Sequence, residues 1–155
     1  MKTVTFCGQY SLHHCNYEHI RKQLYSVLEK LIYEGADCFL LGGNGEFDRM
    51  CAIAVKYYKQ SYPKISSVLV TPYPCLDFDR DLYDKNDHPD LYRINRKYSI
   101  TRRNEYMVRE ADTVVAFVRH AVGEETKMLT YAKSKDKPVI MLSDSKESSD
   151  DNTHL

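Results

Sequence analysis

The feature that most constrains this sequence is a wholly apolar run at residues 38–41 that leads directly into a glycine-rich segment at residues 42–45. An uninterrupted apolar run of this length is typical of a parallel strand that is covered on both faces. Glycines after such a strand allow the chain to turn sharply. Helical spacing of apolar residues begins at Phe47, so this part of the chain predicts a strand–turn–helix unit of an α/β protein.

The same alternation of strand and helix recurs along the chain. Apolar or β-prone runs predict strands at residues 3–7, 38–41, 67–70, 113–118 and 138–142. Apolar residues spaced three and four apart predict helices at residues 16–35, 46–61, 102–110 and 124–134. Units of this kind connect through right-handed crossovers. The sequence therefore predicts a Rossmann-like three-layer α/β/α fold with a mainly parallel five-stranded sheet.

The length of 155 residues fits a single domain, which we expect over residues 1–142. The segment 143–155 is polar and acidic and has no apolar face to bury, so we expect a disordered tail there. The segment 71–99 carries prolines and tyrosines without clear periodicity. A loop of that length inside a compact domain is usually functional or mobile.

Charge and hydropathy limit the classes of partner. Lys plus Arg number 22 and Asp plus Glu number 22, so no net field attracts the chain to nucleic acid, and the sequence argues against such a partner. No apolar stretch approaches the roughly 20 residues that cross a bilayer. The N-terminus lacks a basic segment followed by an apolar one. We therefore expect a cytoplasmic protein with no membrane partner.

Cysteine and histidine residues give no sign of a metal or a resident cofactor. The five cysteines include no C-x-x-C pair, which argues against a disulfide framework and a zinc knuckle. His13 and His14 are adjacent and have no third ligand at metal spacing. A loop or capping role is favoured for both histidines, and we expect no metal and no cofactor.

The glycine-rich segment is the first candidate binding site. Gly42, Gly43, Asn44 and Gly45 join a buried strand to a helix, where backbone N–H groups can approach an anion at the positive end of the helix dipole. The segment is neither a P-loop nor a G-x-G-x-x-G fingerprint. It is a candidate phosphate cradle, and the alternative is a tight turn that needs glycine only for its dihedral angles. Asp48 caps the helix, holds a ligand hydroxyl, or does neither.

Gly8, Gln9 and Tyr10 follow the first strand and form a second candidate segment. We expect them beside the cradle, because the carboxyl ends of parallel strands share one edge of a sheet and ligands bind at that edge. The glycine permits close approach of a ligand, and Gln9 offers both a donor and an acceptor.

Two helix starts supply further candidates. Arg102, Arg103 and Asn104 open one helix, where guanidinium groups can grip a phosphate in two-pronged fashion; the alternative is ordinary surface charge. Gly123 and Thr126 lie at the start of the next helix, and Thr126 can contact a phosphate. The two glutamates between them would repel that phosphate, and their alternative role is to complement the helix dipole.

In combination these motifs resemble a known family. The matching segments, in order, are Phe6-Cys7-Gly8, Gly42-Gly43-x-Gly45-x-Phe47-Asp48, Pro72-Tyr73, Arg102-Arg103-Asn104, Ala111-Asp112 and Tyr131-Ala132-Lys133. They resemble the YpsA-like branch of the SLOG superfamily over residues 3–142. The resemblance implies a Rossmann-like nucleotide-binding domain. Wider relatives include the Lonely Guy phosphoribohydrolases, DprA and sensors of nucleotide-derived signals.

Three functions follow from the resemblance. The first, which we favour, is a binding module (a sensor, carrier or sponge) for a nucleotide or nucleotide-derived small molecule at the carboxyl edge of the sheet. The second is an N-glycosidase acting on a nucleoside monophosphate, with Glu46 as first catalytic candidate and Glu124 or Glu125 as substitutes. The third is a DprA-like single-strand DNA binder, which the zero net charge disfavours.

Departures from the family pattern leave open whether the chain is an enzyme. Related enzymes carry a catalytic glutamate at the position that is Met128 here, and the usual Gly-Gly-Thr before the last helix is replaced by Gly123-Glu124-Glu125. Apolar helix faces in so small a domain also allow a homodimer.

Overall fold

The computed structural model describes residues 1–89 and 95–144, and these residues form one sheet with helices on both faces. The strands are β1 (Lys2–Gly8), β2 (Ala36–Leu41), β3 (Ser66–Val70), β4 (Lys85–Asp87), β5 (Thr113–Phe117) and β6 (Val139–Met141). The helices are α1 (Tyr17–Tyr33), α2 (Glu46–Lys59), a short 3₁₀ turn η1 (Arg96–Tyr98), α3 (Ser99–Glu110) and α4 (Glu124–Ser134). The expected tail, residues 145–155, lies outside the described residues.

The sheet has six strands in the order β4-β3-β2-β1-β5-β6, and every neighbouring pair is parallel. The predicted Rossmann-like α/β fold is confirmed, but the predicted count of five strands is wrong. The additional strand is β4, which lies inside the segment 71–99 that we expected to be a loop. Its sequence is Lys-Asn-Asp, so it has no apolar pattern to reveal it. Backbone pairing with β3 and side-chain bonds hold it, and Asn86 Nδ2, for example, donates to Leu69 O at 2.9 Å.

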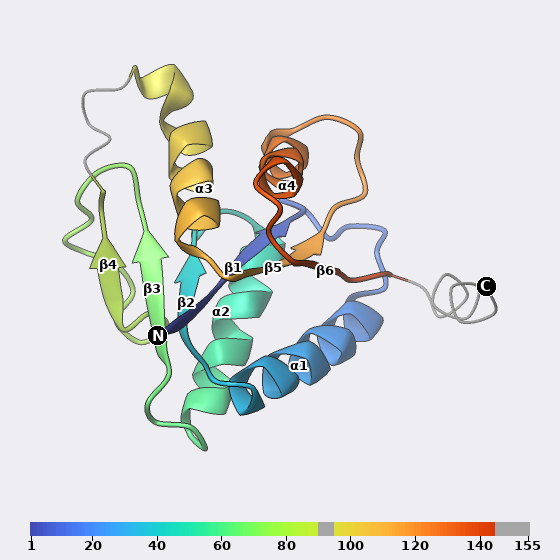
Figure 1. The fold of residues 1–155 in the computed structure, drawn as a ribbon, viewed down its shortest axis with the longest axis vertical. Helices are drawn as coiled ribbons and strands as arrows, with labels where there is room; N and C mark the ends of the chain where they lie inside the picture. The colour runs from blue at the N-terminus through green and yellow to red at the C-terminus, as the bar shows by residue number, and fades with distance from the viewer. Residues whose placement is uncertain (90–94, 145–155) are drawn as a thin grey trace.

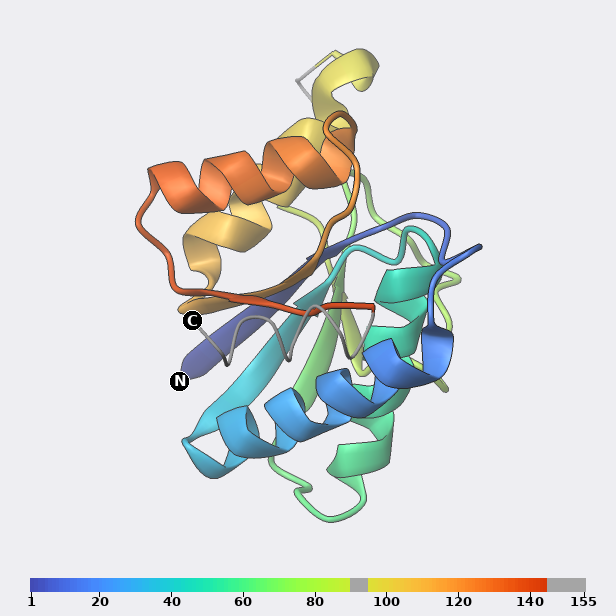
Figure 2. The same ribbon diagram turned by 90° about the vertical axis from the view of Figure 1, so that its right-hand side faces the viewer.

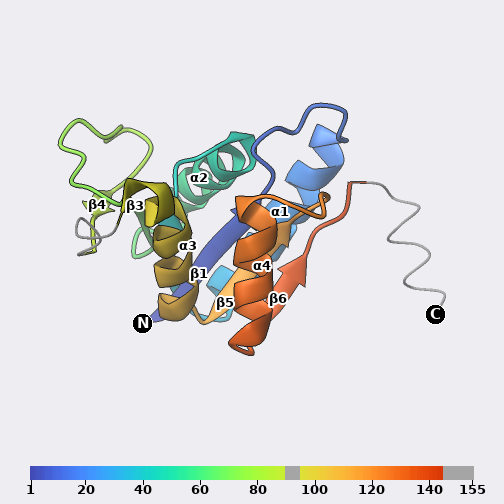
Figure 3. The same cartoon turned by 90° about the horizontal axis from the view of Figure 1, so that it is seen from above.

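The helices form two layers, with α1 and α2 on one face of the sheet and α3 and α4 on the other (Figures 1 and 3). Figure 2 shows the same layers edge-on, with the sheet between them. Successive strand residues point to opposite faces. In β2, accordingly, Phe39 belongs to the core under α1 and α2, whereas Leu40 belongs to the core under α3 and α4.

The strand order of the sheet reverses at the neighbouring strands β1 and β5. The strands β1 to β4 follow one another toward one edge, and the chain then crosses back to place β5 on the other side of β1. In open α/β sheets, ligands bind outside the carboxyl ends of the strands at such a switch point. Gly8 and Phe117, paired at the ends of these two strands, mark that point here.

No helix within residues 1–89 and 95–144 combines the length and apolarity needed to cross a membrane. Three of the five free cysteines are buried, among them Cys7 and Cys38, each of which lies in a strand.

The first turn of α2 packs directly on the end of β1. A Cβ atom at Gly8 would lie 2.0 Å from Cδ2 of Phe47, whose fully buried ring also packs against Phe117 at a centroid distance of 6.1 Å. Only a residue without a side chain fits at position 8. This contact sets how closely α2 approaches the switch point.

We therefore expect Gly8→Ala to lower the free energy of unfolding by about 1–3 kcal/mol, because the added methyl group forces the Phe47 ring out of its site. Urea unfolding of the purified protein measures the loss. Phe47→Leu provides the space, so the Gly8→Ala/Phe47→Leu double variant should lose less stability than the sum of the single variants. Additive losses would contradict a direct contact.

Candidate functional site

A small cavity opens at the carboxyl edge of the sheet, where β1, the start of α2, and the helices α3 and α4 meet. It is lined by Phe6, Cys7, Gly8, Tyr10, Asn44, Asp48, Arg103, Asn104, Met107, Glu124, Glu125 and Met128. Its volume is about 40 Å³. Pockets that enclose a whole drug-sized ligand are roughly ten times larger. A cavity of this size has room for one chemical group of a ligand, and the rest of such a ligand would extend outward past the exposed side chain of Tyr10.

Arg103 is the most buried charged side chain at the cavity, with 3% of its surface exposed. Its Nη1 donates to Gly42 O at 2.8 Å and to Val70 O at 3.3 Å, and its Nε donates to Asn104 Oδ1 at 2.9 Å. Burial lowers the pKa of the guanidinium, and the nearby Asp48 opposes that change. The remaining nitrogen, Nη2, makes no hydrogen bond within the described residues, so it can donate to a ligand.

Asp48, on the first turn of α2, lines the same cavity as Arg103 of α3. Its Oδ2 accepts a hydrogen bond from Asn44 N at 3.2 Å. Burial raises the pKa of Asp48 to about 6, although the Asn44 bond and the Arg103 charge both favour the ionised form. The carboxyl group therefore exchanges its proton near neutral pH, as groups that transfer protons or switch charge often do.

The glycine-rich segment 42–45 is held against the loop after β1 by backbone contacts. The first N–H groups of α2 donate to that loop: Glu46 N to Tyr10 O at 2.7 Å, and Phe47 N to Gln9 O at 3.4 Å. Gly45 has a φ of +99°, and a Cβ there would lie 2.7 Å from Cα of Tyr10. Glycine is thus required for the turn itself. The proposed phosphate cradle stays a prediction.

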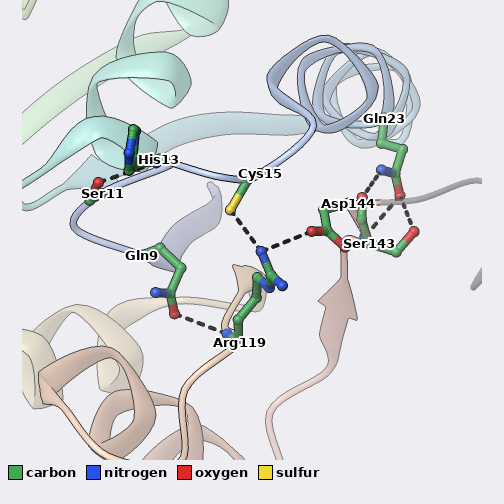
Figure 4. A network of polar contacts seen from close by, with 8 residues as sticks. All are labelled: Gln9, Ser11, His13, Cys15, Gln23, Arg119, Ser143 and Asp144. Atoms are coloured by element: carbon green, nitrogen blue, oxygen red, sulfur yellow. Dashed lines mark hydrogen bonds and ion pairs between the residues drawn. The ribbon is translucent and has the colours of Figure 1, made fainter.

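Gln9 joins the two strands at the switch point. Only 3% of its surface is exposed; its backbone N–H donates to Phe117 O at 3.1 Å, and its Oε1 accepts from Arg119 N at 2.9 Å. Figure 4 shows this contact and the other partners of Arg119, namely Cys15 Sγ at 3.2 Å and the carboxylate of Asp144 at 3.0 Å. Gln9 thus supports the site from outside the cavity lining.

Seven other predicted site residues do not line the cavity, namely Gly42, Gly43, Gly45, Glu46, Arg102, Gly123 and Thr126. Arg102 is exposed and pairs with Glu105 at 2.6 Å. Glu46 is exposed, and its Oε2 accepts from Leu12 N at 3.1 Å. Gly123 and Thr126 line a separate groove between α3 and α4, where Thr126 Oγ1 donates to His120 O at 2.8 Å. The structure therefore divides the two adjacent arginines between solvent and cavity.

Several lining residues were not predicted to bind a ligand, among them Met107 and Cys7. Met107 lies four residues after Arg103, so the helical period was the signal that places the two on one face. The Cys7 Sγ donates to Glu125 O at 3.0 Å, and burial raises the pKa of its thiol to about 12. A protonated, bonded thiol is a poor nucleophile.

The described residues contain no group of three or more His, Cys, Asp and Glu side chains placed to hold a metal ion. Carboxylates nevertheless gather at the cavity: Asp48 approaches it from α2, and Glu124 and Glu125 approach it from α4. Glu124 Oε2 accepts from Thr101 Oγ1 at 2.8 Å, and Lys127 Nζ lies 3.3 Å from its Oε1.

Comparison with known proteins supports the fold. No protein-family model and no curated protein matches the chain. A molybdenum cofactor binding protein from the phototrophic bacterium Rippkaea orientalis superposes with a TM-score of 0.64 at 18% identity, covering 99% of this chain and 83% of that one. The structural genomics target TM1055 superposes with a TM-score of 0.57 at 18% identity, covering 90% of this chain and 72% of that one.

DNA processing protein A from Helicobacter pylori, which binds single-stranded DNA, superposes with a TM-score of 0.61 at 14% identity. The match covers 90% of this chain and 64% of that protein. At these identities the likeness establishes the fold alone. The chain thus has the Rossmann-like α/β fold expected from its sequence, whereas membership of the SLOG superfamily and of its YpsA-like branch stays a prediction.

Proposed function

We propose that the cavity binds a nucleotide-derived small molecule and that the protein acts as a sensor, carrier or sponge for it. The observation that carries this proposal is Arg103, a guanidinium with 3% of its surface exposed and one nitrogen left without a partner among the described residues. Burying a charge costs free energy unless its hydrogen bonds are made. Within the described residues, Nη2 is not among the buried atoms that lack a partner, so water reaches it, and a ligand that accepts from Nη2 would take the place of that water.

The place of the cavity supports a ligand rather than a purely structural role for Arg103. The cavity lies beside the switch point between β1 and β5, and Gly8 from the end of β1 is part of its wall. Polar groups from three separate elements converge there: Asp48 from α2, Arg103 and Asn104 from α3, and Glu124 from α4. A concave site with a few convergent polar groups is the usual form of a small-molecule site.

The structural neighbours support small-molecule binding in general. One of them is a molybdenum cofactor binding protein, so this fold accommodates a cofactor in at least one protein. Another binds single-stranded DNA, so the fold by itself gives no reason to exclude nucleic acid. The equal numbers of acidic and basic residues, 22 each, still favour the small molecule here.

A second candidate function is hydrolysis of an N-glycosidic bond. The observation that favours it is Asp48, whose pKa of about 6 suits proton transfer near neutrality. Glu46, the first catalytic candidate, is exposed, does not line the cavity and is bonded to the loop after β1. Asp48 with Glu124 or Glu125 is the better set for this reaction. Release of free base from a nucleoside monophosphate, lost in Asp48→Asn, would establish it.

The adjacent arginines provide a matched test of ligand binding. We expect Arg103→Lys to weaken binding of any ligand found in a panel of nucleosides, nucleoside monophosphates, ADP-ribose and NAD by at least about tenfold, because a lysine cannot span the same three acceptors. Arg102→Lys should retain the affinity, since Arg102 faces solvent. Isothermal titration calorimetry measures both variants, and thermal unfolding checks their fold. Equal losses in the two variants would contradict this site.

Asp48 also makes stability depend on pH. Because its folded pKa is about 6 and an unfolded carboxyl titrates near 4, the unfolded chain ionises first as the pH rises. The stabilising effect of the protonated form is therefore complete below about pH 4 and is lost between about pH 4 and 6. We expect Asp48→Asn to be more stable than the wild type at pH 7.5 by on the order of 1–2 kcal/mol, and this difference to shrink toward pH 4.

Urea unfolding of both proteins across that pH range measures the effect. Asparagine retains an oxygen that accepts from Asn44 N, so the comparison isolates the charge. A difference between the two proteins that does not change with pH would show that Asp48 titrates as an ordinary exposed carboxyl.

A further inference from the structure

The start of α2, where an anion would be expected to bind, is already bonded to the chain itself. Glu46 N and Phe47 N donate to the carbonyl oxygens of Tyr10 and Gln9. Asn44 N, just before the helix, donates to the Asp48 carboxylate at 3.2 Å. Phosphate binding at a helix N-terminus depends on free N–H groups. Three of the N–H groups that would form a cradle here therefore already donate to acceptors within the chain.

The start of α4 carries its own negative charge. Glu124 and Glu125 both lie in the first turn, and no side chain caps it. The carboxylate of Glu125 folds back over the turn. Its Oε1 is so close to Gly123 that a Cβ atom added there would lie 2.8 Å from it. Carboxylates in this position interact favourably with the helix dipole. They thus provide the charge that a bound phosphate would otherwise supply.

The charges around the cavity do not favour an additional anion. Three carboxylates line it (Asp48, Glu124 and Glu125), and among the described lining residues Arg103 is the sole cation. Arg102, the neighbouring cation, is bonded to Glu105 outside the cavity. A phosphate would lose water and approach three carboxylates. Although Lys127 pairs with Glu124, the single guanidinium of the lining does not offset the charges of Asp48 and Glu125.

The hydrogen-bonding groups of the cavity fit hydroxyl groups instead. Arg103 Nη2 and Asn104 Nδ2 make no hydrogen bond within the described residues, and both are donors. The Asp48 carboxylate has one oxygen that accepts no hydrogen bond from described residues, so the cavity also offers an acceptor. A hydroxyl group donates and accepts at once, whereas a phosphate oxygen at neutral pH mainly accepts.

We infer that the ligand group in the cavity is the sugar diol of an unphosphorylated nucleoside, with its hydroxyls between the Arg103 guanidinium and the surrounding carboxylates. This inference rests on the proposed function and narrows its ligand class. The base of the nucleoside would lie at the open mouth, beside the exposed ring of Tyr10. At the start of α2 three N–H groups are bonded to the chain itself, and at the start of α4 the uncapped N–H groups lie beside the carboxylates of Glu124 and Glu125, so neither helix start favours a 5′-phosphate.

The test compares each of four ribonucleosides with its 5′-monophosphate by isothermal titration calorimetry at low salt, where charge effects are strongest. We expect at least one nucleoside to bind at least about tenfold more tightly than its monophosphate. Glu125→Gln removes one of the repelling charges, so it should narrow that ratio several-fold. Glu110→Gln, at the exposed far end of α3, is the matched control and should leave the ratio unchanged.

The outcomes separate this inference from the function on which it rests. A monophosphate that binds more tightly than its nucleoside, with affinity lost in Arg103→Lys, would overturn the inference and leave the binding function standing. A nucleoside preference that Glu125→Gln and Glu124→Gln both leave unchanged in folded protein would also overturn it. If no nucleoside binds, this inference fails, and the binding function fails as well only if no monophosphate, ADP-ribose or NAD binds either.

Discussion

A buried guanidinium holds the carboxyl edge of this sheet together. Arg103 reaches from α3 to Gly42 O and Val70 O, which follow or end β2 and β3, and its Nε bonds to the neighbouring Asn104. A Cβ at Gly42 would lie 3.0 Å from the guanidinium carbon, so the glycine leaves the space that the charge occupies. The Arg103 guanidinium therefore connects α3 with the turn after β2 and with the end of β3. The cavity lies beside its Nη2, which has no partner among the described residues.

Much of this arrangement was predictable from local patterns. The apolar run before Gly42 predicted β2 and the turn into α2, because parallel strands are covered on both faces. The strand β4 was not predictable in the same way, since a polar edge strand is held by backbone and side-chain bonds that a hydropathy pattern does not record. The site was predicted in part: Arg103 lines the cavity, but Arg102 and Glu46 do not.

The errors share one physical cause, the direction in which a side chain leaves its element. Adjacent residues on a helix point about 100° apart, so Arg102 and Arg103 leave α3 in different directions. The buried positions of α3, which include Met107 and Val108, set its phase and turn Arg103 inward. Glu46 stands next to the glycine turn in sequence but bonds outward to Leu12. Motif spacing identifies neighbours along the chain, and packing decides which of them meet.

The interlocking of Arg103 with Gly42 has a consequence for how such a site adapts. One wall of the cavity consists of groups that also hold strands and helices in place, so a change there costs stability before it alters recognition. The opposite wall, the first turn of α4, is partly exposed and has no side-chain cap. New ligand preferences are therefore most accessible through Glu124 and Glu125, whereas the buried residues of the cavity wall tolerate little variation.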